Sequence, residues 1–190
     1  VVVMSPRKAA EFGIARPVAV RSCVLRSGWD RTGDEDGAAE VCAREAYEEA
    51  GIGPSDLDVV ECHDASAPAE LLAYEALGLC AKGESGKLVE TGDTTLGGRV
   101  PVNTSGGLLR KGHPVGATGI AQIIELTEQL QSRSGARQVE GARVGLARVL
   151  PANDGISLLK LVPRIGADHI PEFRPITLGR PHLELIHLGF

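Results

Sequence analysis

Apolar residues follow two different spacings along this chain, and the spacings predict alternating strands and helices. Short apolar runs between turn residues predict strands at 18–25, 57–62, 100–102, 143–150 and 156–162. Apolar residues three or four positions apart predict helices at 37–50, 68–79 and 116–131, and Ser5-Pro6 is typical of the cap of a short helix ending near 12. This alternation favours an α/β fold in which helices cover the faces of a sheet.

Three stripes of side chains are expected to face the core. In 37–50 the stripe is Ala39, Cys42, Ala43, Ala46 and Ala50, in 68–79 it is Leu71, Leu72, Glu75 and Leu79, and in 116–131 it is Ile120, Ile123, Ile124, Thr127 and Leu130. The sheet should be mixed and mainly parallel, with about five strands. Helical crossovers would join the first strands in parallel, and Asn153-Asp154-Gly155 would turn the last two into an antiparallel hairpin.

The chain divides into a domain at 1–162 and a tail at 163–190. The tail has no clear period and reads as a loosely docked segment, with an edge strand at 183–188 as the alternative. Residues 82–99 are glycine-rich and read as an irregular loop. The apolar start at 1–4 has the character of a last strand whose preceding half is missing.

Bulk composition excludes several classes of protein. Hydrophobic residues make up 43% of the chain and charged residues 24%, as in ordinary soluble domains, and the net charge of −5 provides no basic surface for nucleic acid. No apolar run approaches the roughly 20 residues that span a bilayer, and the start lacks a secretory signal. The 4 cysteines have no metal-ligand spacing, so we expect reduced packing residues, no metal site and a cytoplasmic location.

Two histidines are the candidate catalytic residues. The segment 102–120, VNTSGGLLRKGHPVGATGI, places His113 in a glycine-rich turn before a helix, where backbone N–H groups can face an anionic oxygen. His63 follows the strand VVEC and precedes Asp64. Each histidine alone has an equally plausible structural role. Two at the ends of strands favour acid–base work or hydrogen bonding to an oxyanion.

The segment SGGLLRKGHPVGATG resembles the C-terminal signature of the thiolase superfamily. The stretch ECHDASAPAELLAYEALGLC is similar to sterol-carrier-protein-type thiolases and actinobacterial lipid-transfer proteins, and the resemblance extends from residue 1 to about 162. It implies a thiolase-like C-terminal half in which His63 helps to form an oxyanion hole and His113 is the base that activates a nucleophilic cysteine. Expected substrate-binding residues are Asn103, Ser105, Gly106, Gly107, Gly112 and Gly116.

The resemblance also implies partners and a substrate. Coenzyme A or an acyl-CoA would be a substrate rather than a bound cofactor, and the partner would be the N-terminal thiolase half or a second copy. That half carries the nucleophilic cysteine, so the chain alone is expected to be an inactive piece of an acyl-CoA acyltransferase of lipid or steroid metabolism. Alternatives are a retro-aldol lyase on a CoA thioester and a non-catalytic lipid-binding, CoA-binding or scaffold subunit.

Two positions depart from the pattern of that family. Arg148 lies where relatives carry a second cysteine or a histidine, which removes an acid–base group and favours the lyase or the scaffold. Ser66 stands where an aromatic residue is common, so the acyl pocket is expected to differ.

Overall fold

The computed structural model of the chain describes residues 1–26 and 36–149, and the backbone of 157–163. Its helices are α1 (Pro6–Glu11), α2 (Ala38–Ala50), α3 (Ala67–Ala76), α4 (Ser85–Glu90), α5 (Gly107–Lys111) and α6 (Thr118–Leu130), with single 3-10 turns at Pro54–Asp56 and Gly135–Arg137. Its strands are β1 (Ser22–Arg26), β2 (Val59–Glu61), β3 (Val144–Val149) and β4 (Ser157–Pro163). The predicted tail from 164 onward and the predicted turn at 151–155 lie outside the described residues.

The strands form one mixed sheet in the order β1-β4-β3-β2. β2 and β3 pair in parallel, with Val60 opposite Leu146, while β4 pairs antiparallel with both β3 and β1. The predicted antiparallel relation of the last two strands is therefore confirmed. The predicted parallel pairing of the first strands is confirmed for β2 and the segment at Val102, which make a parallel bridge. It is wrong for β1, which pairs antiparallel with β4 and does not lie beside β2. Two of the three strand pairs are antiparallel, so the sheet is not mainly parallel by pairing.

The expected strand at 100–102 is reduced to an isolated bridge. Val102 makes a parallel bridge to Val60, the carbonyl oxygen of Pro101 accepts from the N–H of Val60 at 3.0 Å, and the N–H of Asn103 donates to the carbonyl of Val60 at 2.8 Å. Pro101 has no N–H to donate, which limits this segment as a partner in a ladder. The described sheet therefore has four strands rather than five.

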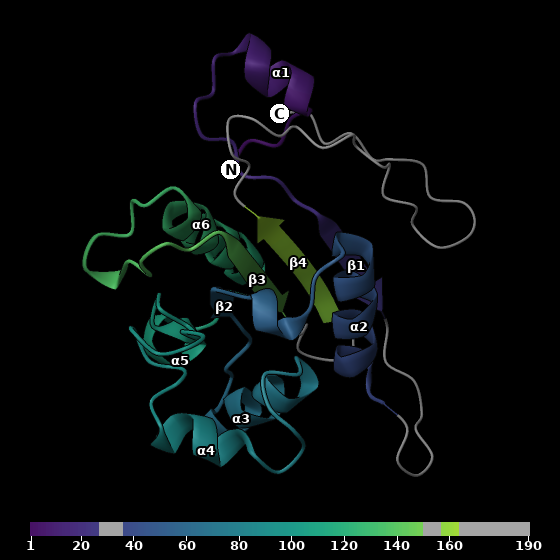
Figure 1. Ribbon diagram of the computed structural model, residues 1–190, viewed down its shortest axis with the longest axis vertical. Coiled ribbons are helices and arrows are strands. Elements are labelled where there is room, and N and C mark those ends of the chain that lie inside the picture. Colours follow the sequence, from purple (N-terminus) through teal and green to yellow (C-terminus); the bar gives the residue numbers. More distant parts are fainter. Residues whose placement is uncertain (27–35, 150–156, 164–190) are drawn as a thin grey trace.

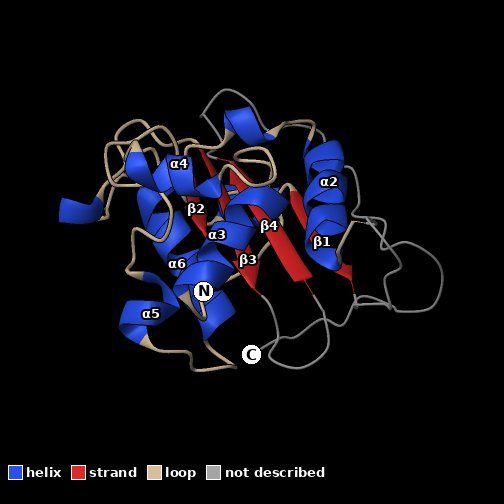
Figure 2. Ribbon diagram, turned by 90° about the horizontal axis from the view of Figure 1, so that it is seen from below, coloured by secondary structure: helices blue, strands red, loops and turns tan. Residues whose placement is uncertain are grey.

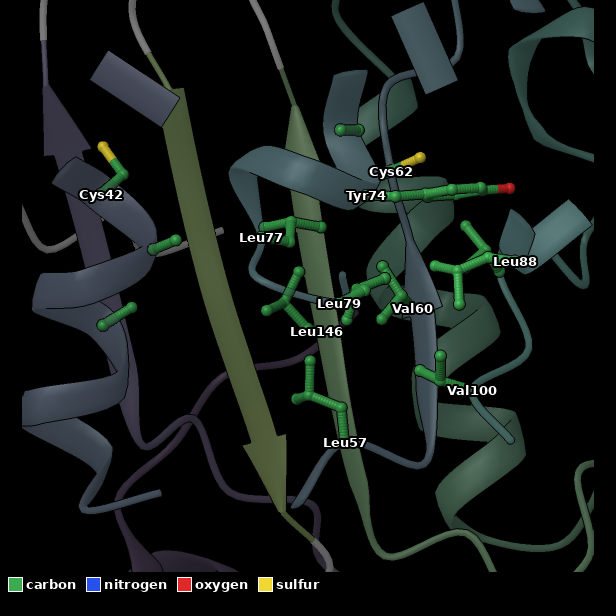
Figure 3. Close-up of a cluster of buried hydrophobic side chains, with 14 of the residues drawn as sticks. Cys42, Leu57, Val60, Cys62, Tyr74, Leu77, Leu79, Leu88, Val100 and Leu146 are labelled. Carbon is green, nitrogen blue, oxygen red and sulfur yellow. The ribbon is translucent and has the colours of Figure 1, made fainter. Parts of the chain in front are cut away.

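Helices cover both faces of the sheet, as expected for a layered α/β fold. Figures 1 and 2 show the strands between α2 and α6. Because side chains alternate along a strand, Val60 and Leu146 face the side of α2 and α3, whereas Val59 and Ala147 face α6. Figure 3 shows the larger cluster, in which Leu77 lies near Leu146 and Tyr74 lies beside Cys62. Each such fully buried Leu or Val contributes roughly 1.5–3 kcal/mol to folding.

The helix stripes agree with the sequence in α2 and differ in α6. Cys42, Ala43, Ala46 and Ala50 are the buried residues of α2, as predicted, and Gly51 ends it at φ 68°. In α6, however, the buried residues are Thr118, Gln122, Glu125, Leu126, Gln129 and Leu130. Ile120 and Ile124, which were expected in the core, are 53% and 43% exposed. The inner face of α6 carries buried polar side chains where apolar ones were expected. These side chains belong to a hydrogen-bond network that is described with the site below.

Four local expectations were also corrected or extended. In α3 the buried residues are Ala73 and Tyr74, and Leu72 of the predicted stripe is 66% exposed. The loop predicted at 82–99 contains α4, and the glycine turn contains α5. Residues 1–4 are exposed and form no strand with the described residues. Ser5 caps α1 as predicted, and this helix lies apart from the sheet (Figure 1). None of the described helices is long and apolar enough to cross a membrane.

Candidate active site

The two predicted histidines lie at one end of the sheet. β2 ends at Glu61, and the chain continues through His63 and Asp64 beside the parallel strand β3. The glycine turn returns to this point, because the carboxylate of Asp64 accepts hydrogen bonds from the N–H groups of Leu108 at 2.6 Å and Leu109 at 3.3 Å. The carboxyl ends of neighbouring parallel strands are a common location for a site in α/β proteins.

The imidazole rings of His63 and His113 are in contact. Their centroids are 4.8 Å apart and their planes meet at 90°, an edge-to-face arrangement. His63 is buried and His113 is half-buried. Tertiary folding thus brings together the two side chains that the sequence identified separately.

Thr118, at the start of α6, orients His113. Its Oγ1 lies 2.7 Å from Nδ1 of His113 and donates to the carbonyl oxygen of Pro114 at 3.3 Å. Because a hydroxyl has one proton, its donation to Pro114 makes Oγ1 the acceptor of a proton on Nδ1. This assigns the Nδ1–H tautomer from the hydrogen-bond network and leaves a lone pair on Nε2. Nε2 is buried without a hydrogen-bond partner, so it is available to accept a proton.

His63 is held in its neutral form. Burial lowers its pKa, and the charges of His113 and Arg148 lower it further, while Asp64 acts in the opposite direction. Its Nδ1 atom is also buried without a partner. A neutral imidazole has one N–H donor and one acceptor, and the donor can stabilise a developing oxyanion without carrying a charge of its own.

Asp64 and Gly107 fix the position of the turn relative to His63. Gly107 has φ 62°, and a Cβ atom there would lie 2.0 Å from Oδ2 of Asp64. Only glycine allows this approach in this backbone conformation. Gly107 is an expected substrate-binding residue, but the Asp64 carboxylate fills the space beside its Cα atom.

Asn103 and Ser105 are also turned toward the protein rather than toward a ligand. Oδ1 of Asn103 accepts from the N–H of Cys62 at 2.9 Å, and its Nδ2 donates to Sγ of Cys62 at 3.4 Å. The hydroxyl of Ser105 donates to Oε2 of Glu61 at 2.5 Å, and its N–H donates to Oε1 at 3.0 Å. These contacts tie the glycine turn to the end of β2.

The remaining predicted glycines differ in the space around them. A Cβ atom on Gly106, at φ 97°, would lie 3.2 Å from Arg110, whereas Gly112 and Gly116 have no heavy atom within 4 Å of that position. Gly112 and Gly116 flank His113 and are exposed. They are therefore the predicted substrate-binding residues with free space beside the backbone.

A buried polar network supports the floor of the site. Glu61 is 1% exposed, and burial raises its pKa even though Ser105 hydrogen-bonds to it and the charge of Lys111 opposes the rise. The ammonium group of Lys111 donates to the hydroxyl of Ser105. The glycine turn is thereby joined to Glu61 through one shared hydroxyl.

The inner face of α6 completes this network. Nε2 of Gln129 donates to Oε1 of Glu125 at 3.0 Å and to Oγ1 of Thr104 at 3.1 Å, and Arg137 pairs with Oε2 of Glu125 at 2.9 Å. Burial works against ionisation of Glu125, but the hydrogen bonds from Arg137 and Gln129 prevail and lower its pKa. Sequence periodicity missed this network because it assigns glutamate and glutamine to solvent.

Arg148 lies at the same end of the sheet. Glu61 pairs with Ala147, so the next position along brings Arg148 level with Cys62, immediately before His63. Arg148 is 5% exposed and its Nε atom has no hydrogen-bond partner. Burial lowers its pKa. The sequence marked this arginine as a departure from the thiolase pattern.

The two buried cysteines, Cys42 and Cys62, are poor nucleophiles. Cys62 adjoins His63 but faces the core beside Tyr74 (Figure 3), and burial raises its pKa. Burial likewise raises the pKa of Cys42 to about 11. A thiolate is the reactive form of cysteine, so neither thiol is prepared for attack.

Other candidate ligand sites are less developed. A surface hollow of about 740 Å³ lies between α2, the Pro54–Asp56 turn and the end of α3, and the histidine pair does not line it. Within the described residues, no group of three or more His, Cys, Asp or Glu side chains could hold a metal ion. The chemistry available at the site is therefore proton acceptance at His113 and hydrogen bonding or charge stabilisation at His63 and Arg148.

Comparisons with known proteins were made by sequence and by structure. A family model described as "Thiolase C-terminal domain-like" matches residues 31–151. Sterol carrier protein 2 of Rattus norvegicus is 58% identical over 108 residues, which is 57% of this chain and 20% of that protein. Benzoylsuccinyl-CoA thiolase subunit BbsB of Thauera aromatica is 44% identical over 156 residues, 78% of this chain and 40% of that protein.

A solved structure agrees with these relatives. The Ltp2-ChsH2(DUF35) aldolase superimposes with a TM-score of 0.66 at 26% identity, over 78% of this chain and 40% of that chain. The present chain spans less than half the length of each of these three proteins.

Proposed function

The chain belongs to the thiolase C-terminal domain-like family, and from that premise we propose that it is the C-terminal half of an acyl-CoA acyltransferase. The observation that carries this proposal is the contact between His63 and His113, in which Nε2 of His113 has a lone pair and no partner. Acyl transfer through cysteine needs a base beside the thiol and a donor for the carbonyl oxygen. This pair provides both.

In the proposed reaction the nucleophilic thiol comes from outside this chain. Nε2 of His113 takes the proton of that thiol, and the thiolate attacks the thioester carbonyl of an acyl-CoA. The N–H of His63 donates to the oxyanion that forms. Collapse of this intermediate releases CoA, which takes the proton held on Nε2 of His113, and leaves an acyl-cysteine. In condensation, a second acyl-CoA loses a proton from its α-carbon to a base outside this chain, and that carbon attacks the acyl-cysteine and releases the cysteine thiolate. Thiolysis is the reverse sequence, in which CoA takes the acyl group formed by cleavage of a ketoacyl-CoA. Coenzyme A is thus a substrate and not a resident cofactor.

The proposed partner is the N-terminal thiolase half, which would carry this cysteine, or a second copy of the chain. Two facts support it: the relatives are more than twice as long as the matched segment, and α6 exposes Ile120 and Ile124 on its outer face. Contiguous exposed apolar side chains favour a protein contact.

The match to sterol carrier protein 2 supports a lipid or steroid acyl group as the substrate of the proposed reaction. No disulfide joins the cysteines, which supports a cytoplasmic location.

A retro-aldol lyase acting on a CoA thioester is the second candidate. The structural similarity to a protein named as an aldolase favours it, and so does Arg148 in place of a second acid–base residue. A lyase of this kind forms no acyl-cysteine, and therefore depends less on an external thiol.

Native mass spectrometry of the chain purified from its source tests the proposal first. A stable complex with a second chain that contains a reactive cysteine supports the acyltransferase. Activity is then assayed on that complex, with His113→Ala expected to reduce turnover by about 10²–10⁴-fold, as for loss of a general base. Unchanged turnover would mean a scaffold subunit. An aldehyde or ketone product without consumption of CoA would mean a lyase.

A further inference from the structure

Arg148 is a buried charge without a bonded counter-ion among the described residues. It is 5% exposed, its Nε atom has no hydrogen-bond partner, and the ion pairs of the described residues do not include it. Glu40 and the cysteines at 42 and 62 act on it only through space. An uncompensated buried charge is strongly unfavourable, and the described residues provide no bonded anion for it, so Arg148 is suited to bind one from a ligand.

The location of Arg148 indicates which anion can reach it. Arg148 lies level with Cys62 in the β2–β3 pair, one position before His63, and its charge acts on the His63 ring. Nδ1 of His63 and Nε2 of His113 are likewise buried without partners. Three polar atoms from β3, the end of β2 and the glycine turn are therefore unsatisfied around one strand end.

We propose that Arg148 binds a carboxylate on the acyl chain of the substrate, so that the site selects acyl-CoA esters bearing a second acidic group. The inference rests on the proposed function, which places the acyl group at the two histidines. A guanidinium presents parallel N–H donors that match a carboxylate, and such bidentate pairs combine strength with directional selectivity. The structure thus gives Arg148 a specificity role in addition to the acid–base roles of the histidines.

A carboxylate on the acyl group fits this position better than a phosphate of CoA. Nε of Arg148, Nδ1 of His63 and Nε2 of His113 are all buried, so an anion that pairs with them must give up its hydration, and a small planar carboxylate has less hydration to lose than a phosphate. The phosphates of CoA are larger and carry more charge, and burial of a charged group becomes more unfavourable as its hydration is lost. The acyl end of the ester is also the part that must reach His113.

Calorimetric titration of the full chain with two esters of equal acyl length tests the proposal. Glutaryl-CoA has a terminal carboxylate, and pentanoyl-CoA has a methyl group in its place. We expect glutaryl-CoA to bind about tenfold more tightly, as for a hydrogen bond to a charged group. Arg148→Met should reduce the ratio of the two affinities to about one, and Arg148→Lys should retain part of it.

Arg143→Met is the matched control, because Arg143 is exposed and precedes the other end of β3. It should leave the affinity ratio unchanged. Equal affinities of the wild-type chain for both esters would overturn the proposed role of Arg148 and would leave the proposed acyl-CoA site untouched. An equal loss of affinity for both esters in Arg148→Met would overturn it too, since the arginine would then be serving the CoA moiety. Absence of binding by either ester would contradict the proposed acyl-CoA site itself.

The melting temperature of the Arg148 variants is a second measurement that tests whether the arginine is structural. Removing an uncompensated buried charge is often neutral or stabilising, so Arg148→Met should melt no lower than the wild type without ligand. A marked fall in melting temperature of Arg148→Met, together with full retention of the affinity ratio in Arg148→Gln, would show that the arginine is structural.

Discussion

At the scale of single residues, the site gives two imidazoles different tasks through their surroundings. His113 is oriented by the hydroxyl of Thr118, which fixes the proton on Nδ1 and leaves Nε2 bare. His63 is kept neutral by burial and by the charges of His113 and Arg148. These different surroundings suit the proposed roles of His113 as proton acceptor and His63 as hydrogen-bond donor, although the free side chains are chemically identical.

Replacing the hydroxyl of Thr118 should disturb the tautomer of His113 without unfolding the chain. In Thr118→Val, Nδ1 loses its acceptor, so both tautomers become populated. We expect the nitrogen chemical shifts of His113, measured by NMR, to move toward the average of the two forms. In the complete enzyme, turnover should fall by less than the roughly 10²–10⁴-fold expected for removal of the base.

Thr118→Ser is the matched control, since it retains the oxygen. It should keep the Nδ1–H tautomer. Identical nitrogen shifts in the valine variant and the wild type would mean that Thr118 does not set the tautomer.

The lowered pKa of His63 predicts a loss of stability in mildly acidic solution. The unfolded chain takes up a proton near the ordinary histidine pKa of about 6.5, whereas the folded chain resists until a lower pH. The free energy of unfolding should therefore decrease as the pH falls through about 6.5, and level off below the folded-state pKa. Urea denaturation at a series of pH values between about 5 and 7.5 measures this change.

His63→Gln removes the titrating group and should flatten that dependence. Glu125, with its lowered pKa, loses its stabilising contribution only at lower pH, below the ordinary glutamate pKa of about 4.3. Glu61, whose pKa is raised by burial, acts in the opposite direction above that value. The histidine contribution is therefore the difference between the wild type and His63→Gln, since the carboxylates are common to both. An unchanged pH dependence in His63→Gln would assign the effect to another group.

At the scale of elements, the glycine turn and the end of β2 form one unit. Asp64 bonds the first N–H groups of α5, Asn103 bonds the backbone of Cys62, and Ser105 bonds Glu61. The turn thus bonds to Glu61, Cys62 and Asp64, at the end of β2 and just beyond it. This unit, rather than either segment alone, holds the two histidines in contact.

Gly107→Ala should break that unit. The new Cβ would lie 2.0 Å from the Asp64 carboxylate, in a backbone conformation at φ 62° that alanine rarely adopts. We expect a loss of about 1–3 kcal/mol in the free energy of unfolding, typical of backbone strain of this kind. The edge-to-face contact of the histidines should also weaken, seen as altered ring-proton shifts.

Alanine substitutions at two other glycines are controls that separate the effect of backbone strain from the effect of contact with Asp64. Gly112 has φ 80° with open space around it, so Gly112→Ala should show strain without displacement of Asp64. Gly116 has open space and no positive φ, so Gly116→Ala should leave stability unchanged. Equal stabilities of the alanine variants at 107 and 116 would contradict the role given to Asp64.

At the scale of the whole molecule, one face of α6 serves the interior and the other is open to solvent. The inner face carries the polar network around Glu125 and Gln129, and the outer face exposes Ile120 and Ile124. Such an inverted distribution is expected when a helix lies between the core of its own chain and a second protein surface. It fits a chain that spans only part of its relatives.

Polar substitution on the outer face of α6 should affect assembly rather than folding. Ile120→Ser and Ile124→Ser should leave the melting temperature of the lone chain within about 2–4 °C of the wild type, since these side chains are already exposed. The fraction of chain found in the native complex should fall. Leu72→Ser, on an exposed position of α3, is the control and should leave assembly unchanged. Assembly that resists both isoleucine substitutions would place the interface elsewhere.

The sequence by itself determined the class of fold and the candidate residues of the site. In the part of the chain that the structure describes, period and turn residues located the helices longer than six residues and the four strands within a few positions, since these depend on local spacing. The unusual glycine spacing around His113 and the His63-Asp64 pair identified the histidines and the family. Their roles as base and oxyanion donor remain predictions, as do the substrate and the partner.

Only the tertiary structure decided the strand order, the inner face of α6 and the partners of the polar side chains. β4 lies between β1 and β3 because pairing joins distant segments, which local periodicity does not encode. Glu125 and Gln129 are buried because Thr104 and Arg137 satisfy them there, and hydropathy alone assigns them to solvent. Gly107 proved to accommodate Asp64, and Arg148 proved to be buried beside His63. Each of these facts depends on what surrounds a side chain in space, and that is fixed only when the whole chain has folded.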